Sequence, residues 1–579
     1  MYQSQMQEPA SQAVGEDYRP QSAQSRMDAW FRSHSDLVAL LAVAAGFLLR
    51  VRAAAGTFLN PDEALHFSVA NQTSLPAAYR ASLTLAHPPL LIFLLYFWRH
   101  VGTSEFVLRL PSVILGTAFC WIFFKWVQGL VGSTAGLTGL IFVALLPPIV
   151  ALSSEVRQYA LLLFFIAMAA FLLERALAKN SAALMAMSSI CVWCGMLSHY
   201  SGLLFAAAFG IYSALCLIQR RLTRTVMATW AAGQLGVFAA VVFLYRTQIS
   251  RLKGSAMAEQ AINEWLRRSY FHPGYDNLVS FVVGRSFAVF QFIFGQHVIG
   301  DIAGLFFLAG VGLLLSRRRI REQVATTPWL LAIFLVSPFA INCALAVTGR
   351  YPYGGTRHSV FLAMFAFAGI GYFFAAVTRQ RTPIAVATAA IIVAVCYAFG
   401  FHHQPYMTRD DQSSARMNKA IQFIRSQIPP ADPILMDYQT SLMLGHYLCV
   451  QQSSMRISGA GLGANDFLGP RTEVIPALMP TFQVLHCGDH SLVLSPAREW
   501  MFAPETFPRS WDEFVAQNAL KPGSDVWVVQ AGWGVGIAPE LQHKRSDIAP
   551  ADIQLFGKNI SMFKLTVAQK TIGFSSDSR

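Results

Sequence analysis

The sequence predicts a polytopic α-helical membrane protein of about 11–13 transmembrane helices, followed by a C-terminal extracytoplasmic α/β domain. Hydrophobic residues make up 54% of the 579 residues and charged residues only 13%, about half of the ~25% that is usual in soluble domains. Eleven apolar runs, each near the ~20 residues needed to cross a bilayer, lie between residues 36 and 401. After residue 402 the apolar runs shorten to the length of β-strands.

The chain begins with a polar segment rich in Gln and Ser, residues 1–35, which we expect to be a disordered cytoplasmic tail. The first apolar run, near 36–56, is long for a signal peptide and carries Arg50 and Arg52 near its end. We therefore expect a retained first span. The other runs lie near 106–127, 133–151, 156–176, 181–197, 200–219, 226–245, 299–316, 329–348, 357–378 and 383–401.

Short basic loops between these runs orient the chain, because the positive-inside rule places such loops in the cytoplasm. Eleven spans with a cytoplasmic N-terminus give a transmembrane domain over residues 36–402 and a periplasmic domain over residues 403–579. Two further apolar stretches, 88–101 and 276–298, carry internal polar residues, and we expect both at the outer interface. If both stretches crossed the membrane, the protein would have thirteen spans. The basic loops contain Arg220, Arg221 and Arg224; Arg317, Arg318, Arg319 and Arg321; and Arg379 and Arg381.

The net charge of +13 agrees with this topology. Residues 403–579 carry 15 basic and 16 acidic residues, so the surplus of basic residues lies in the first 402. A basic chain can also bind nucleic acid, but the total charge here is too low for a basic groove. We therefore expect the lipid bilayer, and no nucleic acid, among the partners.

The outer domain is predicted from alternating helical and strand-length patterns. The helical pattern lies at 412–428, and the strand-length runs lie at 434–438, 491–496, 525–530 and 561–567. Cys449 and Cys487 fall in this domain, where an oxidising compartment would permit a disulfide between them. Cys191 and Cys194 lie inside an apolar run, which indicates helix packing rather than a redox or zinc site.

Five polar clusters from distant parts of the chain fall on the outer side under this topology. Ionisable groups beside a membrane are costly, so we regard these clusters as the candidate functional site. They are Asn60-Pro61-Asp62-Glu63, His87-Pro88-Pro89, Ser154-Glu155-Val156-Arg157-Gln158-Tyr159, His199-Tyr200 and the segment from Gly349 to His358.

Each cluster has a structural and a chemical interpretation. Asn60 and Pro61 are typical of a helix start, where acidic residues such as Asp62 stabilise the first turn. Arg157 and Tyr159 are typical anchors at a membrane interface. Chemically, a carboxylate can act as a general base, while arginine and histidine side chains can hold a phosphate. A lipid-linked sugar phosphate requires both kinds of group beside an apolar groove.

At these residues the sequence resembles the GT-C glycosyltransferases, in the branch that contains protein O-mannosyltransferases and the bacterial aminoarabinose transferase of lipid A. The resemblance covers roughly residues 36–400 in order and spacing. Where the aminoarabinose transferase has a lysine, this chain has His87, as the mannosyltransferases do. The outer domain differs from the mannosyltransferases' carbohydrate-binding insertion. The matching pieces are Asp62-Glu63, His87-Pro88-Pro89-Leu90, Ser104-Glu105-Phe106-Val107-Leu108-Arg109-Leu110-Pro111, Ser154-Glu155-Val156-Arg157-Gln158-Tyr159 and Arg357-His358.

The resemblance implies a GT-C-like membrane enzyme that moves a sugar, with inversion, from a polyprenyl-phosphate donor to a glycan, lipid or protein hydroxyl. The reaction would occur at the outer face of a bacterial inner membrane, without a cofactor or a catalytic metal. Asp62 would be the catalytic base, and Glu63 would orient the base or the acceptor. The donor-phosphate candidates are Arg109, Arg157, Arg350, Arg357 and His358, and the pocket candidates are His87, Tyr159, His199 and Tyr200. The sugar and the acceptor stay open.

A multi-span lipid or solute transporter is the alternative function. It would have broken helices near the membrane midplane and repeated halves, whereas the polar clusters gather at one face and the sequence shows no inverted repeat. A membrane scaffold would leave Asp62 with only a capping role. The sequence contains no GxxxxGK[ST] motif, which argues against an ATP-driven pump.

Overall fold

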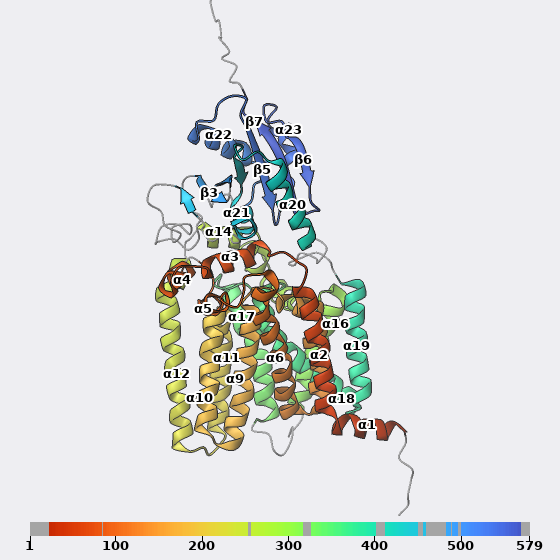
Figure 1. The fold of residues 1–579 in the computed structure, drawn as a ribbon. Helices are drawn as coiled ribbons and strands as arrows, with labels where there is room; N and C mark the ends of the chain where they lie inside the picture. The colour runs from red at the N-terminus through yellow and green to blue at the C-terminus, as the bar shows by residue number, and fades with distance from the viewer. Residues whose placement is uncertain are drawn as a thin grey trace, which may run out of the picture.

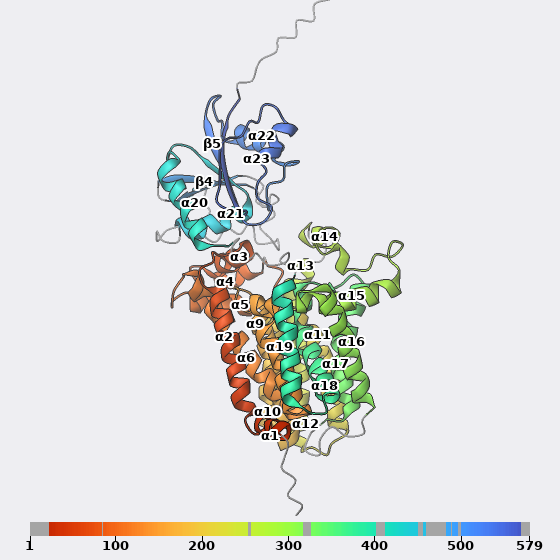
Figure 2. The ribbon, with the colours of Figure 1, turned by 90° about the vertical axis from the view of Figure 1, so that its right-hand side faces the viewer.

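The computed structural model describes residues 23–83, 85–252, 256–316, 326–400, 412–449, 456–458, 482–487, 489–495 and 500–568. Figure 1 shows a bundle of helices that carries a smaller domain with a β-sheet at one end, which we call the sheet end. The first helix, α1 (Ala23–Ser33), lies at the opposite end in both views (Figures 1 and 2). The predicted fold class, a helical membrane protein with a C-terminal α/β domain, is confirmed.

Nine helices in the described part of the chain are long and apolar enough to cross a membrane. Each of the eleven predicted runs forms one of these nine or one of two shorter apolar helices, α7 (Ser133–Leu145) and α10 (Ala182–Ser198). The long helices are α2 (Ser35–Ala54), α6 (Glu105–Val131), α9 (Tyr159–Lys179), α11 (Ser201–Ile218), α12 (Arg224–Leu244) with η1 (Tyr245–Ile249) and α13 (Ser250–Leu252), α16 (His297–Leu315), α17 (Pro328–Val347), η3 (Arg357–Leu362) with α18 (Ala363–Val377), and α19 (Thr382–Phe399).

Close packing explains how the short helix α7 fits inside the bundle. Pro147 opens the next helix, α8 (Pro147–Leu152), so the chain turns soon after Leu145. On the neighbouring α18, a Cβ added at Gly371 would lie 2.5 Å from the carbonyl oxygen of Ala135. A small residue at this contact lets the two backbones approach closely, as is common between membrane helices.

Two further helices occupy the stretches 88–101 and 276–298, which we expected at the outer interface. The helix α5 (Leu90–Trp98) has nine residues and is therefore only about 14 Å long, less than half the ~30 Å thickness of the hydrocarbon core. The helix α15 (Leu278–Phe294) has 17 residues, and Figure 2 shows it at the sheet end, near α14 (Ala256–Asn263).

The helix α1 lies within the segment 1–35 that we expected to be disordered, while residues 1–22 lie outside the described residues. Met27 and Trp30 are 47% and 46% exposed on this helix, and α1 contacts α19 at the end of the bundle. Exposed apolar side chains beside a transmembrane bundle are typical of a helix at the membrane surface. The polar composition of the whole segment conceals this short amphipathic part.

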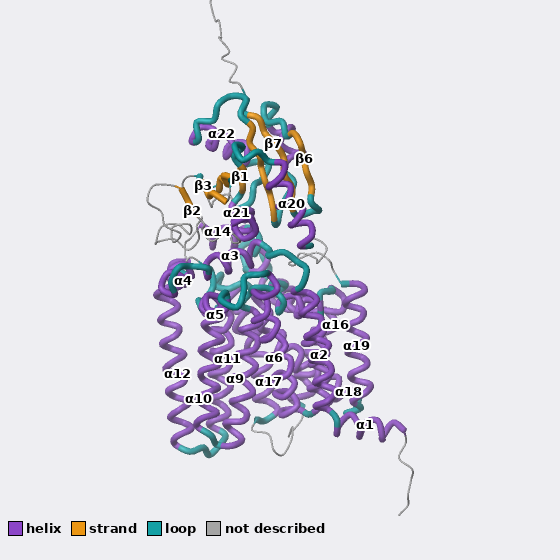
Figure 3. The backbone as a smooth tube through the Cα atoms, viewed as in Figure 1, coloured by secondary structure: helices purple, strands orange, loops and turns teal. Residues whose placement is uncertain are grey.

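The C-terminal domain contains a seven-stranded mixed sheet with the strand order β2-β3-β4-β1-β5-β7-β6. The central strand β1 is parallel to β4 and β5, and the other neighbouring pairs are antiparallel. Figure 3 shows the strands gathered in this domain. The strands are β1 (Ile434–Met436), β2 (Arg456–Ser458), β3 (Gln483–Cys487), β4 (His490–Leu494), β5 (Asp525–Ala531), β6 (Ala551–Leu555) and β7 (Ile560–Thr566).

Alternating side chains along β5 give the sheet two apolar faces. Val526 and Val528 pack with α22 and α23 on one face, whereas Trp527 and Val529 pack with α20 and α21 on the other. The second core continues into α3 and α4, the two helices that follow α2. The C-terminal domain and the first loop of the membrane domain therefore share one hydrophobic core. The helices concerned are α3 (Pro61–Ala70), α4 (Leu75–Ser82), α20 (Ser414–Gln427), α21 (Tyr438–Leu444) with η4 (Gly445–Cys449), α22 (Phe507–Gln517) and α23 (Ala538–Lys544).

The cysteines of the membrane domain and of the C-terminal domain differ in what the structure shows. Cys191 and Cys194 lie on α10 as free thiols. The side chains of Cys449 and Cys487 lie outside those that the structure describes, so the disulfide between them stays a prediction.

Candidate active site

Asp62 lies in the first turn of α3. The side chain of Asn60 accepts a hydrogen bond from the Glu63 N–H at 3.0 Å, and the Glu63 carboxylate accepts one from the Asn60 N–H at 3.0 Å. This reciprocal pair, with Pro61 at the first helical position, fixes the start of the helix. The structural interpretation therefore applies to Asn60, Pro61 and Glu63, but this capping does not use the Asp62 side chain.

Two arginines from other parts of the chain pair with Asp62. Its Oδ2 atom forms an ion pair with Arg157, between α8 and α9, and lies 2.9 Å from Nη2 of Arg357, at the start of η3. The side chain of Arg157 is 3% exposed, that of Asp62 17% and that of Arg357 26%. Burial alone would raise the pKa of Asp62, but Arg157 and Arg357 lower this pKa to about 2. The carboxylate is therefore charged at neutral pH, and both it and Arg357 keep some solvent access.

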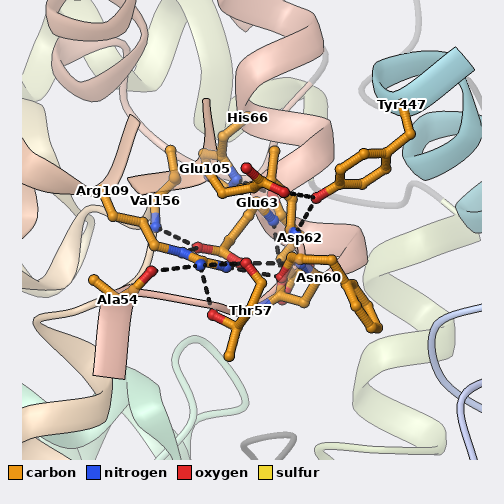
Figure 4. Close-up of polar contacts among 12 residues, drawn as sticks. Ala54, Thr57, Asn60, Asp62, Glu63, His66, Glu105, Arg109, Val156 and Tyr447 are labelled. Carbon is orange, nitrogen blue, oxygen red and sulfur yellow. Dashed lines mark hydrogen bonds and ion pairs between the residues drawn. The ribbon is translucent and has the colours of Figure 1, made fainter. Parts of the chain in front are cut away.

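The neighbouring Glu63 is buried and pairs with Arg109 of α6. The Nε atom of Arg109 lies 2.7 Å from Oε1 of Glu63, and Nη2 lies 2.6 Å from Oε2. The other guanidinium N–H groups donate to the backbone oxygens of Ala54 and Thr57 (Figure 4) and to that of Phe58. All the N–H groups of Arg109 thus have acceptors within the protein, and a donor phosphate would have to displace one of them.

Val156 connects the Glu63–Arg109 ion pair to the Asp62–Arg157 ion pair. Its N–H donates to Oε1 of Glu63 at 2.8 Å, and the next residue is Arg157. On its other side, Glu155 has a pKa raised to about 7, first by burial and second by the charge of Glu63. Glu155 belongs to a predicted polar cluster, but the sequence did not single it out as a site residue.

Four histidines form a continuous row beside Asp62. The ring centroids of His66 and His87 are 5.5 Å apart, those of His87 and His199 are 5.6 Å apart, and those of His199 and His358 are 5.9 Å apart. Burial lowers the pKa of His66 to about 4 and lowers the pKa values of His87 and His199 well below 6.5. These three imidazoles are therefore uncharged at neutral pH.

His66 is a site residue that we did not predict from the sequence. It lies four residues after Asp62 on α3, and its Nδ1 lies 2.6 Å from the Asp62 carbonyl oxygen. This spacing places the two side chains one helical turn apart on the same face. The position of His66 relative to Asp62 is thus a signal that helix periodicity could have provided.

Several buried nitrogen atoms of this site have no hydrogen-bond partner within the described part of the chain. They are His66 Nε2, His87 Nδ1, His358 Nδ1 and Arg157 Nε. Buried polar atoms in native proteins nearly always have a partner. These nitrogen atoms therefore leave unused hydrogen-bonding capacity close to Asp62.

The remaining predicted residues divide into two groups. Tyr159 is buried, its ring lies 5.4 Å from that of His199, and its hydroxyl accepts a hydrogen bond from Arg157 at 3.3 Å. Tyr200 instead donates to Gln248 at 3.2 Å. Arg350 is exposed beyond the end of α17. Tyr159 thus belongs to the site, whereas Tyr200 and Arg350 are not in contact with Asp62.

Among the described residues, no three His, Cys, Asp or Glu side chains are arranged to hold a metal ion.

The sequence model of one family, described as dolichyl-phosphate-mannose-protein mannosyltransferase, matches residues 86–245. This match confirms the predicted resemblance to the glycosyltransferase branch that contains the protein O-mannosyltransferases. The matched segment begins after α3 and ends before η3, so it contains Arg109 and Arg157 but neither Asp62 nor Arg357. No curated protein matches the chain in sequence.

Solved structures with a similar arrangement include ArnT from Cupriavidus metallidurans in the apo state, with 11% identity and a TM-score of 0.49 over 91% of this chain and 97% of that chain. Another is the archaeal oligosaccharyltransferase AglB from Archaeoglobus fulgidus, in complex with an inhibitory peptide and a dolichol-phosphate. It has 11% identity and a TM-score of 0.47 over 87% of this chain and 70% of that chain. In two other structures of the Archaeoglobus fulgidus oligosaccharyltransferase, the chain spans 60% and 64% of the length.

Proposed function

We propose that the chain is a membrane glycosyltransferase that moves a sugar from a polyprenyl-phosphate donor to a hydroxyl group of a glycan, lipid or protein. The observation that carries this proposal is the Asp62 carboxylate held between Arg157 and Arg357. The match to a family named for dolichyl-phosphate-mannose supports a lipid-linked donor.

The charges of the site suit such a donor. One carboxylate and two guanidinium groups leave a net charge of +1 at the Asp62 cluster, the nearby histidines are uncharged, and Glu155, with a pKa of about 7, is only partly ionised at neutral pH. A phosphodiester that links a sugar to a polyprenol carries one negative charge, so it would neutralise the cluster. Arg157 and Arg357 would then share their N–H groups between Asp62 and the phosphate, as guanidinium groups readily do.

This sharing would also activate the base. In the ligand-free site the two arginines hold the pKa of Asp62 near 2, which makes the carboxylate a weak base. A bound phosphate would draw the cations away and raise this pKa. Asp62 would then accept the proton of the acceptor hydroxyl, and the hydroxyl oxygen would form its bond to the anomeric carbon.

The bond from the anomeric carbon to the phosphate oxygen breaks in the same step, and its electron pair goes to the phosphate. Arg157 and Arg357 stabilise the charge that develops there. Attack from the side opposite the phosphate inverts the anomeric centre. His87, His358 and the buried His199 form the pocket wall, while Glu63 and Arg109 hold α3 in place instead of touching the donor.

We place the reaction at the outer face of a bacterial inner membrane, with the N-terminus in the cytoplasm. The turn between α18 and α19 carries Arg379 and Arg381, and α1 contacts α19 at the end of the bundle opposite the sheet. The positive-inside rule assigns this end to the cytoplasm, so the sheet end and Asp62 lie on the periplasmic side.

The test is an assay of the full-length protein in liposomes. The donors are undecaprenyl-phosphate-linked hexoses and pentoses, and the acceptors are lipids and glycans extracted from a bacterial envelope. We expect release of undecaprenyl phosphate together with a new glycoside. Movement of the intact donor across the bilayer without a glycoside would overturn the proposal and favour a lipid transporter.

A further inference from the structure

Tyr447 of the C-terminal domain reaches the start of α3. Its hydroxyl accepts a hydrogen bond from the Leu59 N–H at 2.8 Å and donates one to Oε1 of Glu105 at 2.9 Å (Figure 4). Leu59 directly precedes Asn60, the N-cap of α3. Glu105 begins α6, one helical turn before Arg109. A single hydroxyl thus joins the entry of α3 to the helix that pairs with Glu63.

The hydroxyl is suited to this double role. Burial, with the charge of Glu105, raises the pKa of Tyr447 well above its usual value, so the phenol stays protonated and can donate. A hydrogen bond to a carboxylate is stronger than one between neutral groups. The buried Leu59 N–H would lose its partner without Tyr447, and an unpaired buried donor is costly.

Other contacts of the C-terminal domain converge on the same helix. The ring of His446 lies edge-to-face at 5.3 Å from that of Phe67. Gly532, at the end of β5, has φ +113°, and a Cβ added there would lie 2.7 Å from Cγ of Pro61. The C-terminal domain therefore touches α3 at its first residue, at its entry and on its apolar face.

A helix as short as α3 depends on such contacts. It has ten residues, and isolated helices below about 12 residues are marginal in water. Its direction, and with it the position of the Asp62 carboxylate, is therefore set by what holds its start. The chain of bonds runs from Tyr447 to Leu59, through the Asn60–Glu63 pair, and ends one residue from Asp62.

We propose that the C-terminal domain is part of the catalytic apparatus and that Tyr447 is a positioning residue for Asp62. This inference rests on the proposed function, since it assigns Tyr447 a role in aiming the base. It differs from a domain that only selects acceptors or covers the membrane cavity, because such a domain would not alter the rate constant of the chemical step.

The test compares Tyr447→Phe with Tyr438→Phe in the full-length protein in liposomes. Tyr438 is fully buried in the same shared core, and its hydroxyl has no hydrogen-bond partner among the described residues, so its variant loses the same atom without losing a bond. With the undecaprenyl-phosphate sugar that the wild type uses, we expect Tyr447→Phe to lower kcat about ten-fold. The donor KM should stay within about two-fold, and Tyr438→Phe should match the wild type.

Hydrogen exchange of the backbone around residues 56–66 provides a second readout that does not require activity. Exchange should be faster in Tyr447→Phe and unchanged in Tyr438→Phe. Wild-type kcat in Tyr447→Phe, an equal loss in both variants, or unchanged exchange in Tyr447→Phe would each overturn the inference. If the proposed function were wrong, the wild type itself would release no undecaprenyl phosphate, so the two failures can be told apart.

Discussion

Asp62 and Glu63 are neighbours in the sequence but have different surroundings, because successive residues of a helix point about 100° apart. Asp62 faces Arg157, between α8 and α9, and Arg357, the first residue of η3, and is 17% exposed. Glu63 faces Arg109 and is fully buried. The adjacent acids therefore differ in environment, since Asp62 keeps some access to solvent and Glu63 anchors its helix.

Replacing Arg357 by Gln tests the phosphate-binding assignment. Arg357 is the more exposed of the two arginines on Asp62, and hydrogen bonds to charged groups contribute about 1.5–3 kcal/mol. We expect kcat/KM for the donor to fall roughly 10- to 100-fold, mainly through a higher KM, with partial recovery in Arg357→Lys. Arg509→Gln, on the 81% exposed Arg509 side chain of α22, is the control. A donor KM unchanged in Arg357→Gln would contradict the assignment.

Glu155 makes the stability of the protein depend on pH. Its pKa in the folded protein is raised from 4.5 to about 7, so between these values the folded state binds more protons than the unfolded state. The free energy of unfolding should therefore fall as the pH rises from about 4.5 to 7. Thermal unfolding at pH 5 and pH 8 measures this difference, which should shrink in Glu155→Gln. An equal difference in both proteins would show that Glu155 is not the group responsible.

The sequence predicted the cluster of Asp62, Arg157 and Arg357, because each lies at or just beyond the end of an apolar run and the predicted topology puts all three ends on the outer side. It did not predict that Arg109 is enclosed by Glu63 and by backbone carbonyl groups. These contacts of Arg109 form only when the segment before α3 folds back over the start of α6. A contact between such distant segments cannot be predicted from a local sequence pattern.

At the scale of elements, the packing of α7 against α18 is a testable contact. An alanine at Gly371 would place its Cβ 2.5 Å from the carbonyl oxygen of Ala135, and a backbone atom has little freedom to move. We expect Gly371→Ala to destabilise the protein by about 1–3 kcal/mol. Gly312→Ala on α16, where a Cβ would meet nothing within 4 Å, is the matched control. Equal melting temperatures for the two variants in detergent would refute this packing.

Apolar run length predicted the helices of the bundle well, because the membrane imposes a fixed length on each span. The strands β1, β4, β5 and β7 were also predicted, since buried strands have apolar runs. β2, β3 and β6 were not predicted. In β6, the residues of this edge strand are mostly exposed, and its sequence, Ala551–Leu555, has no clear apolar face. The helix α7 is shorter than its predicted run, 133–151, because Pro147 starts a separate helix, α8, within that run, whereas α10 has the length of its run, 181–197.

For the whole molecule, the prediction to test is the orientation in the membrane. The test introduces Arg221→Cys into a variant that has no other cysteine. The new thiol should react with a membrane-impermeant maleimide only after the inner membrane is opened. A cysteine at Lys558, in the C-terminal domain, should react in intact spheroplasts. The positive-inside rule gives this expectation, since Arg221 lies in a basic loop between α11 and α12. The reverse labelling pattern would place the Asp62 cluster in the cytoplasm and contradict the proposed outer-face reaction.

The shared core between the C-terminal domain and α3 could not be predicted from the sequence, because the residues of α3 and those of the C-terminal domain are more than 300 positions apart. It makes the whole molecule, rather than the helical bundle alone, the unit that presents Asp62. The same arrangement explains why the residues of the site come from helix ends and loops at the sheet end, while the long helices serve as the scaffold.

The most direct test of the account is the turnover number of Asp62→Asn with the undecaprenyl-phosphate sugar that the wild type uses. Asparagine keeps the size of the side chain but cannot accept the proton, so we predict that kcat falls at least about 100-fold. Binding of undecaprenyl phosphate should be retained or tightened, because Arg157 and Arg357 lose their competing carboxylate. Wild-type turnover in Asp62→Asn would contradict the assignment of Asp62 as the catalytic base.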